Sequence, residues 1–383
     1  PTHIYTYNRS MQTELLMLEL IKKPSLYWLL LLAPLAFYLE HTHASPVVIF
    51  FTAAFSILPI AKGIVHFTEQ VAHHTSASIG ALLNATFGNA PEMMIAFFSF
   101  FSGKHVLVLG SIAGAILANL LLALGISFIV GGIKYREQKF NIDGVRTLNS
   151  VMLVAVLSMM ISSAFEQKFS ETAALINVHT LNISVAILLL ITYVGFLWFM
   201  LKTHSSLFET IPAEGDHKAN ASFELNSTHL SLNKSIVGLV LCSVAAAFIS
   251  ELLVGVAEET GQRLGMSEAF VGLILVAVVG GAAESFSAIS LARSGRIDMS
   301  LAIALGSCVQ IALFVAPILI LLSYFVGPHP MDLIFNRGEM AAVFAAVLLT
   351  IMLVSDGRSN WFKGVQLLVL YFIMAMLFYV MPS

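Results

Sequence analysis

Long apolar stretches recur along this 383-residue chain, and most are close to the ~20 residues that a helix needs to cross a bilayer. Only 11% of the residues are charged, whereas a typical soluble domain carries roughly 25%. Too few charged side chains remain to cover a water-exposed surface, so the sequence predicts an all-α polytopic membrane protein. Hydropathy, with proline, glycine and polar runs as boundaries, predicts eleven membrane-spanning helices, at residues 24–40, 46–73, 78–102, 105–132, 146–164, 178–202, 233–260, 267–293, 298–326, 338–355 and 361–381.

One long polar segment, residues 204–234, follows the sixth predicted helix and divides the chain. It separates two groups of five helices, with the first helix as an extra element. We therefore expect four parts: an N-terminal segment with the first helix (1–45), a first five-helix unit (46–203), a cytoplasmic linker (204–232) and a second five-helix unit (233–383).

Lysines and arginines lie mostly on one side of the predicted membrane, the bias that marks the cytoplasmic side. If the N-terminus is cytoplasmic, the inner segments hold fourteen of the 19 Lys and Arg residues, the outer segments hold four, and Lys62 lies within a helix. The inner residues are Arg9, Lys22, Lys23, Lys134, Arg136, Lys139, Arg146, Lys202, Lys218, Lys234, Arg293, Arg296, Arg358 and Lys363, and the outer ones are Lys104, Lys168, Arg263 and Arg337. A missed helix would invert this pattern downstream, so the distribution favours eleven crossings, with the C-terminus on the side opposite the cytoplasm.

The two five-helix units share a motif, "FGNAPEMMIAFFSF" in the first and "VGGAAESFSAISLA" in the second. Three landmarks match between the units: Glu92 with Glu284, Gly114 with Gly306, and Glu69 with Glu258 after a three-residue insertion. Close helix packing alone would explain matched glycines, but it does not explain matched glutamates. Because each unit has an odd number of crossings, the two would enter the membrane from opposite sides, as in the inverted repeats of many secondary transporters.

Glu92 and Glu284 both lie near the middle of a predicted span. A charged side chain there costs about 2.5–3.5 kcal/mol even on lenient scales, so such residues face a cavity, pair with one another or bind an ion. A protonated glutamate satisfied by a neighbouring helix is the structural alternative. Glycine at 88 and 280 and proline at 91 loosen the helix beside each glutamate, and the carbonyls freed there would line a cavity. We expect the two glutamates to converge on one site at the midplane.

The donors around this site are hard oxygen ligands. Asn84 and Asn89 add amides to the two carboxylates, Gly88 and Gly280 open the backbone, and neither motif carries a cysteine or histidine cluster suited to zinc or copper. Calcium takes six to eight oxygen ligands in a flexible shell. Two carboxylates without a cation would repel each other and take up protons. This donor set predicts a site that holds either one divalent cation or protons.

Other polar residues of the spans have less certain roles. Glu69 and Glu258, toward the ends of their helices, could relay protons or form the cation entrance, or could be interfacial residues in contact with headgroups. Gln310 could orient Glu284 or offer an amide oxygen, or could be a packing amide, and Asn119 is its analogue in the first unit.

On the segments "GNAPE", "GGAAE" and "GSCVQIALFVAP", and on the eleven-helix plan, the chain resembles the cation/proton exchanger family of calcium/cation antiporters over nearly all of residues 46–381. The resemblance implies that Glu92 and Glu284 bind calcium and protons alternately. It also implies an amide ligand at Asn89 and a pathway acid at Glu69, and it matches Gln310 to the glutamine of the second repeat. The chain departs from the family pattern at Gly281, where an amide is usual, and at Ser285, where a histidine is usual.

We therefore predict a secondary transporter, not an enzyme, that exports calcium from the cytoplasm in exchange for protons. Sodium, potassium or manganese as the exchanged cation, a cation channel and an intramembrane enzyme are the alternatives. We expect no permanently bound cofactor, with Ca²⁺ and H⁺ as transported substrates. The expected partners are inorganic cations and the lipid bilayer, with no nucleic acid, and a homo-oligomer stays open. The expected location is a prokaryotic inner membrane.

Overall fold

The structure, a computed structural model, describes residues 26–75, 83, 86–169, 175–208, 230–326, 330–332 and 334–380. Asn84, one of the predicted ligands, lies outside these residues, as do positions 209–229 of the predicted linker.

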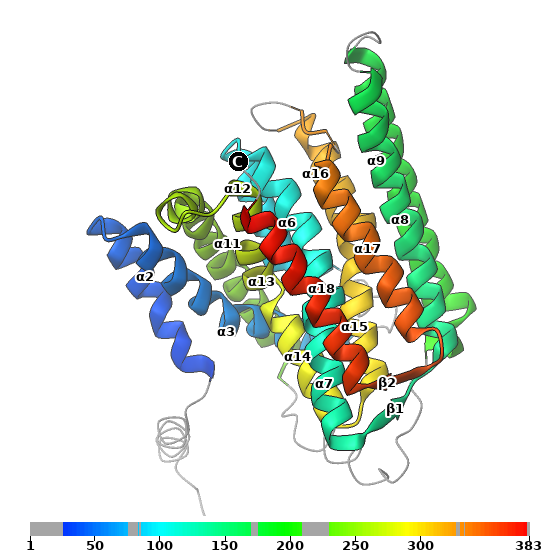
Figure 1. The fold of residues 1–383 in the computed structure, drawn as a ribbon. Helices are drawn as coiled ribbons and strands as arrows, with labels where there is room; N and C mark the ends of the chain where they lie inside the picture. Colours follow the sequence, from blue (N-terminus) through cyan, green and yellow to red (C-terminus); the bar gives the residue numbers. More distant parts are fainter. Residues whose placement is uncertain are drawn as a thin grey trace, which may run out of the picture.

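The described chain is almost entirely helical (Figure 1). Eight of its helices are long and apolar enough to cross a membrane, or nine if one bent pair counts as a single span. Two shorter apolar helices cover Leu26–His41 and Ala90–Phe101. The elements of the first half are η1 (Leu26–Leu31), α2 (Leu32–His41), α3 (Pro46–His73), α5 (Ala90–Phe101), α6 (His105–Leu117), η2 (Ala118–Ala123), α7 (Leu124–Tyr135), β1 (Glu137–Lys139), α8 (Ile142–Phe169), α9 (Leu175–Trp198), η3 (Phe199–Thr203) and η4 (Ser205–Phe208). Those of the second half are α11 (Leu232–Arg263), α12 (Glu268–Phe270), η5 (Val271–Val276), α13 (Ala277–Gly280), α14 (Ala282–Arg293), α15 (Ile297–Gln310), η6 (Ile311–Val315), α16 (Ala316–Ser323), α17 (Arg337–Val354), β2 (Arg358–Asn360) and α18 (Trp361–Val380).

Most predicted helix boundaries agree with the structure to within a few residues. The long span His105–Tyr135 continues from α6 through the π-helical turn η2 into α7. The all-α prediction is confirmed. The sequence did not predict β1 and β2, which pair as a short antiparallel two-stranded sheet with Gln138 opposite Ser359.

The helices pack around two apolar clusters. One lies among α3, α5 and α11, and the other, larger one lies among α6, α8, α9 and the helices from α15 to α18. In Figure 1, α8 and α9 stand together at one side of the molecule, and α2 and α3 lie at the other. The elements between them, α5, α6, α13 and α14, hold the two predicted glutamates near the centre of the fold.

Small residues let two of these central elements approach closely. Gly110 of α6 faces Gly272 of η5, and a Cβ on Gly110 would lie 3.3 Å from the Gly272 Cα. One turn further along α6, a Cβ on Gly114 would lie 2.6 Å from the Leu273 Cα, closer than real Cβ atoms come to backbone. Without a hydrophobic driving force between helices in lipid, such close packing is a main source of helix association.

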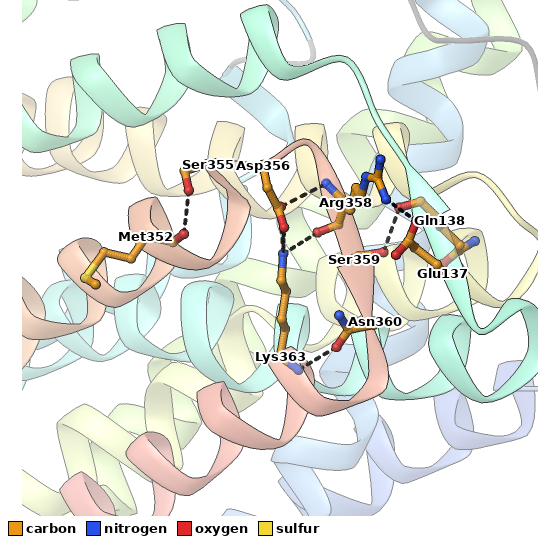
Figure 2. A network of polar contacts seen from close by, with 9 residues as sticks. All are labelled: Glu137, Gln138, Met352, Ser355, Asp356, Arg358, Ser359, Asn360 and Lys363. Atoms are coloured by element: carbon orange, nitrogen blue, oxygen red, sulfur yellow. Dashed lines mark hydrogen bonds and ion pairs between the residues drawn. The ribbon is translucent and has the colours of Figure 1, made fainter.

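A cluster of polar contacts, here called the β1–β2 clasp, joins the two halves of the chain at the end of the molecule where α7 and α17 finish (Figure 2). It consists of Glu137, Asp356, Arg358 and Lys363. Arg358 Nη1 of β2 lies 3.1 Å from Glu137 Oε1 of β1. The Lys363 Nζ at the start of α18 donates to Asp356 Oδ1 at 2.6 Å, to Asp356 Oδ2 at 2.7 Å and to the Arg358 carbonyl at 2.8 Å. Partial burial alone would raise the pKa of Asp356, but hydrogen bonds from Lys363 and the Arg358 N–H, with the lysine charge, bring this pKa below its ordinary value of 3.8.

Replacing Lys363 by Met should lower the melting temperature in detergent at pH 7 by roughly a few degrees, because the loss of one salt bridge is worth about 1 kcal/mol or less. The lowered pKa of Asp356 sets the pH dependence. The stabilisation by the Lys363–Asp356 ion pair is fully present above about pH 4, and it is lost as the pH falls through the folded-state pKa of Asp356. The difference in melting temperature between wild type and the Lys363→Met variant should therefore shrink below about pH 4. A difference that stays constant with pH would contradict the ion pair as its cause.

Replacing Gly114 by Val should destabilise the fold by about 1–3 kcal/mol or more, because the side chain would overlap the backbone of η5. The matched control is Gly195→Val on α9, since Gly195 is exposed and a Cβ there meets nothing within 4 Å. Thermal unfolding in detergent should show a lower melting temperature for the first variant alone. Equal stability of the two variants would contradict the close approach of α6 and η5.

Candidate cation-binding site

Each predicted glutamate lies in the first turn of a twelve-residue helix. Glu92 is the third residue of α5 and Glu284 is the third residue of α14. A break beside each glutamate is expected from the sequence, and the backbone turns just before both of them. The bend between α13 and α14 is 58°. The positive end of each helix dipole therefore lies beside a carboxylate and favours its charged form.

Both glutamate side chains are buried and near one another. Glu92 is 8% exposed and Glu284 is 9% exposed, and the two carboxyl groups are close enough to interact electrostatically. The Ser307 hydroxyl of α15 donates a hydrogen bond to Glu284 Oε2. Neither Glu92 oxygen has a hydrogen-bond partner among the described residues. Unpaired buried carboxyl oxygens are costly, so the site as built requires a proton or a cation.

The amides beside the glutamates are arranged differently in the two halves. Asn89, which precedes α5 and is 1% exposed, donates through Nδ2 to Gln310 Oε1 at the end of α15. Orientation of Glu284 was one of the roles that the sequence left open for Gln310, whereas the structure joins Gln310 to Asn89 of the other half. The Asn89 Oδ1 has no hydrogen-bond partner within the part of the chain that the structure describes, so this oxygen is available to a ligand.

Two glycines bring the second half against Glu92. A Cβ on Gly280 would lie 3.2 Å from Glu92 Cγ, and one on Gly281 would lie 3.5 Å from Glu92 Oε1 and 4.0 Å from Asn119 Oδ1. Gly88 lies in the turn just before Asn89. These contacts show that the motif around Glu284 and the residues of α5 form one site.

The backbone contributes less than the sequence suggested. The carbonyl of Asn89 accepts a hydrogen bond from the Met93 N–H at 3.0 Å, and that of Gly281 accepts one from the Ser285 N–H at 2.9 Å. These two carbonyls are therefore not freed by the breaks, and the prediction of freed carbonyls is wrong for them. Side-chain oxygens are the main ligands that this site offers.

A cavity of about 10 Å³ adjoins Glu92, room for about one water molecule. Glu92, Ser111 and Gly280 lie at its wall, and the remaining lining is aliphatic, from Ile95, Ala96, Ile112, Ala115, Val276, Ala277, Ile311 and Val315. The cavity follows α5 away from the break at Asn89.

Glu69 and Glu258 do not join the site. Both side chains are exposed, and each lies near the C-terminal end of its helix, α3 or α11. The end of α3 is fixed beside the start of α11 by Gln70 Oε1, which accepts from the Leu230 N–H at 3.2 Å. At the far end of α11, Glu258 Oε2 lies 3.9 Å from the Lys104 Nζ. A proton-relay or entrance role stays a prediction for both.

Sequence reasoning missed Ser307 as the partner of Glu284 and did not relate Asn119 to Gly281. The signal for Ser307 was its place directly after Gly306 in the matched segment "GSCVQ". Asn119 was identified only as the analogue of Gln310, and it lies within the π-helical turn η2.

Comparison with known proteins gives a consistent family. The sodium/calcium exchanger protein family matches residues 45–202 and 234–380. A Ca²⁺/H⁺ antiporter of Aphanothece halophytica is 37% identical over 368 residues, covering 94% of this chain and 98% of that protein. The Ca²⁺/H⁺ antiporter ChaA of Bacillus subtilis is 37% identical over 340 residues, covering 88% of this chain and 94% of that protein.

Solved structures agree with this result. The structure of native YfkE has a TM-score of 0.78 at 34% identity, and the match covers 93% of this chain and all of that one. The H⁺/Ca²⁺ exchanger CAX, at 14% identity, shares the fold with a TM-score of 0.68. The resemblance drawn from the motifs is confirmed, and the chain belongs to the sodium/calcium exchanger protein family.

Proposed function

We propose that this protein exchanges Ca²⁺ for H⁺ across a membrane. The observation that carries the proposal is the pair of buried glutamates at equivalent positions of two short helices, with Glu92 lacking any protein partner among the described residues. The relatives named as Ca²⁺/H⁺ antiporters support the exchange of the same two ions.

The mechanism follows from charge balance. Two ionised carboxylates match the charge of one Ca²⁺, and Asn89 Oδ1 adds a neutral oxygen beside them. Without the cation, two neighbouring buried carboxylates repel each other, so protons replace it. Loss of the cation and uptake of protons are thereby the same event, which is the coupling that an exchanger needs.

Eleven crossings in a 1 + 5 + 5 arrangement complete the proposed architecture, with units at 46–203 and 233–383. The packing of the helices supports an inverted repeat, because contacts come in equivalent pairs: α9 packs on α16 as α18 packs on α7, and α8 packs on α15 as α17 packs on α6. In addition, α5 and α14 have equal length, and the π-helical turns η2 and η6 follow at matching positions. Alternating access would then occur by movement of the repeats about the site between them.

We infer that the N-terminus is cytoplasmic and that the membrane is a prokaryotic inner membrane. Segments with the excess of basic residues gather at one end of the molecule, where Lys134 Nζ donates to the Arg293 carbonyl at 3.0 Å and β1 pairs with β2. Predicted outer segments gather at the other end, where Lys104 Nζ donates to the Val254 carbonyl at 2.8 Å and Ser267 Oγ donates to the Phe378 carbonyl at 2.9 Å.

The two sides of the site differ in polarity. On the side proposed as outer, aliphatic residues line the cavity beside Glu92: Ile95, Ile112, Val276, Ile311 and Val315. In the sequence, the equivalent positions of the other unit lie 192 residues away, the separation of Glu92 from Glu284. These positions carry small or polar residues: Ser287, Ala304, Asn84, Asn119 and Ala123. This asymmetry favours entry of a hydrated cation from the cytoplasmic side and a tighter seal toward the outside.

Glu92→Gln and Glu284→Gln should each reduce Ca²⁺-dependent proton flux in proteoliposomes by about 100-fold or more, because removing one partner of a buried charge interaction costs about 3–5 kcal/mol. The matched control is Glu259→Gln, since Glu259 is exposed and pairs with Arg263 at the surface. The control should keep wild-type flux. Flux that survives either of the first two substitutions would contradict the proposed exchange site.

The orientation can be tested with single cysteines in a chain whose Cys242 and Cys308 are replaced by Ala. Cysteine introduced at Arg263 should react with a membrane-impermeant thiol reagent added outside intact cells, and cysteine at Ser355 should react only after the membrane is opened. Both positions are exposed, so protection reports the membrane and not burial. Labelling in the reverse order would contradict the cytoplasmic N-terminus.

A further inference from the structure

The backbone conformation at position 281 does not require a glycine. Gly281 has φ −81° and ψ 7°, in the range that any residue adopts. Asn89, its counterpart before α5, has similar angles of −95° and 24°. An asparagine at 281 would therefore fit the same backbone, and it is a preferred residue at a helix N-cap.

Packing does not require glycine at 281 either. A Cβ there would meet the Ala277 carbonyl oxygen and Glu92 Oε1, both at 3.5 Å, and Asn119 Oδ1 at 4.0 Å. These are ordinary van der Waals distances, unlike the close approaches at Gly114. The space over Gly281 is thus a small gap bordered by oxygen atoms.

The two halves of the site differ at this gap. In the first half, Asn89 is fixed by its hydrogen bond to Gln310. At the offset of 192 residues, the pair related to Asn89 and Gln310 is Gly281 and Ala118, and neither has a polar side chain. Asn119, the predicted analogue of Gln310, lies one position further on. The neighbouring Asn119 is 1% exposed, and its Nδ2 has no partner among the residues described. Glu92 Oε1, on the other side of the gap, also lacks one.

We propose that the gap over Gly281 holds a water molecule that Glu92 and Asn119 bind and that serves as a ligand of the transported cation. The water donates a hydrogen to Glu92 Oε1 and accepts one from Asn119 Nδ2, which leaves a lone pair of the water for the cation. It takes the position that an amide side chain would fill in a symmetric site. This inference rests on the proposed function, because it assigns one ligand of the same cation site.

A ligand water has a consequence for specificity. An amide fixed to the backbone holds its oxygen at one distance, whereas a water can shift to suit ions of different radius. Calcium accepts 6–8 oxygen ligands at 2.3–2.6 Å in a flexible shell, and a larger ion such as Sr²⁺ needs longer distances. The site should therefore transport Sr²⁺ nearly as well as Ca²⁺.

Two substitutions at 281 separate this proposal from a purely steric role. Ala fills the gap and offers no oxygen, so Gly281→Ala should raise the half-saturating Ca²⁺ concentration for proton-coupled flux about tenfold. Asn is larger but returns an oxygen, so Gly281→Asn should stay within roughly threefold of wild type and should discriminate several-fold more strongly against Sr²⁺. Gly195→Ala on α9 is the matched control, and purified protein of each variant is checked for a wild-type melting temperature.

Asn119→Ala removes the other binding partner of the water and should also raise the half-saturating Ca²⁺ concentration about tenfold. The double variant Gly281→Ala/Asn119→Ala should be no weaker than either single one, because both remove the same water.

Two results would overturn the proposal: an Asn variant impaired more than the Ala variant, or additive effects of Gly281→Ala and Asn119→Ala. These outcomes are distinct from failure of the proposed function, which would appear as absent Ca²⁺-dependent proton flux in the wild-type protein.

Discussion

Two carboxyl groups are enclosed in the apolar centre of this membrane protein, and they cannot both stay ionised and unaccompanied. A buried negative charge must be balanced by a cation or removed by a proton. The remaining features of the site follow from this constraint. The helices α5 and α14 begin just before their glutamates, so each carboxylate lies at the positive end of a helix dipole. Ser307 adds a hydrogen bond at Glu284 only, which leaves the oxygens of Glu92 without a described protein partner.

The surrounding fold holds this pair without filling the space between the halves. Gly110, Gly114 and Gly272 allow α6 and η5 to approach closely, so the backbone break at Gly281 is held against Glu92. Far from the site, the β1–β2 clasp ties the loop after α7 to the loop before α18 (Figure 2). On the other side of the site, α3 and α11 pack mainly on one another.

Much of this could be predicted from the sequence, because a membrane restricts the choices. Length and hydropathy fix helices such as α3, whose predicted and observed bounds both run from 46 to 73. The cost of a buried charge singled out Glu92 and Glu284. Side-chain partners were not predictable, since the bond from Asn89 to Gln310 joins residues 221 positions apart. The pairing of β1 with β2 also depends on tertiary packing, which leaves no periodic signal. Glu69 and Glu258 matched as landmarks of the repeat, yet the antiparallel course of α3 and α11 places them far from each other.

The central claim is that the same two carboxyl groups hold either a divalent cation or protons. Calorimetric titration of the purified protein with Ca²⁺, repeated in buffers of different ionisation enthalpy, counts the protons released for each ion bound. The account predicts release of at least one proton per Ca²⁺ under conditions in which the empty site is protonated, and loss of both binding and release in Glu92→Gln. Calcium binding without proton release at every pH tested would contradict it.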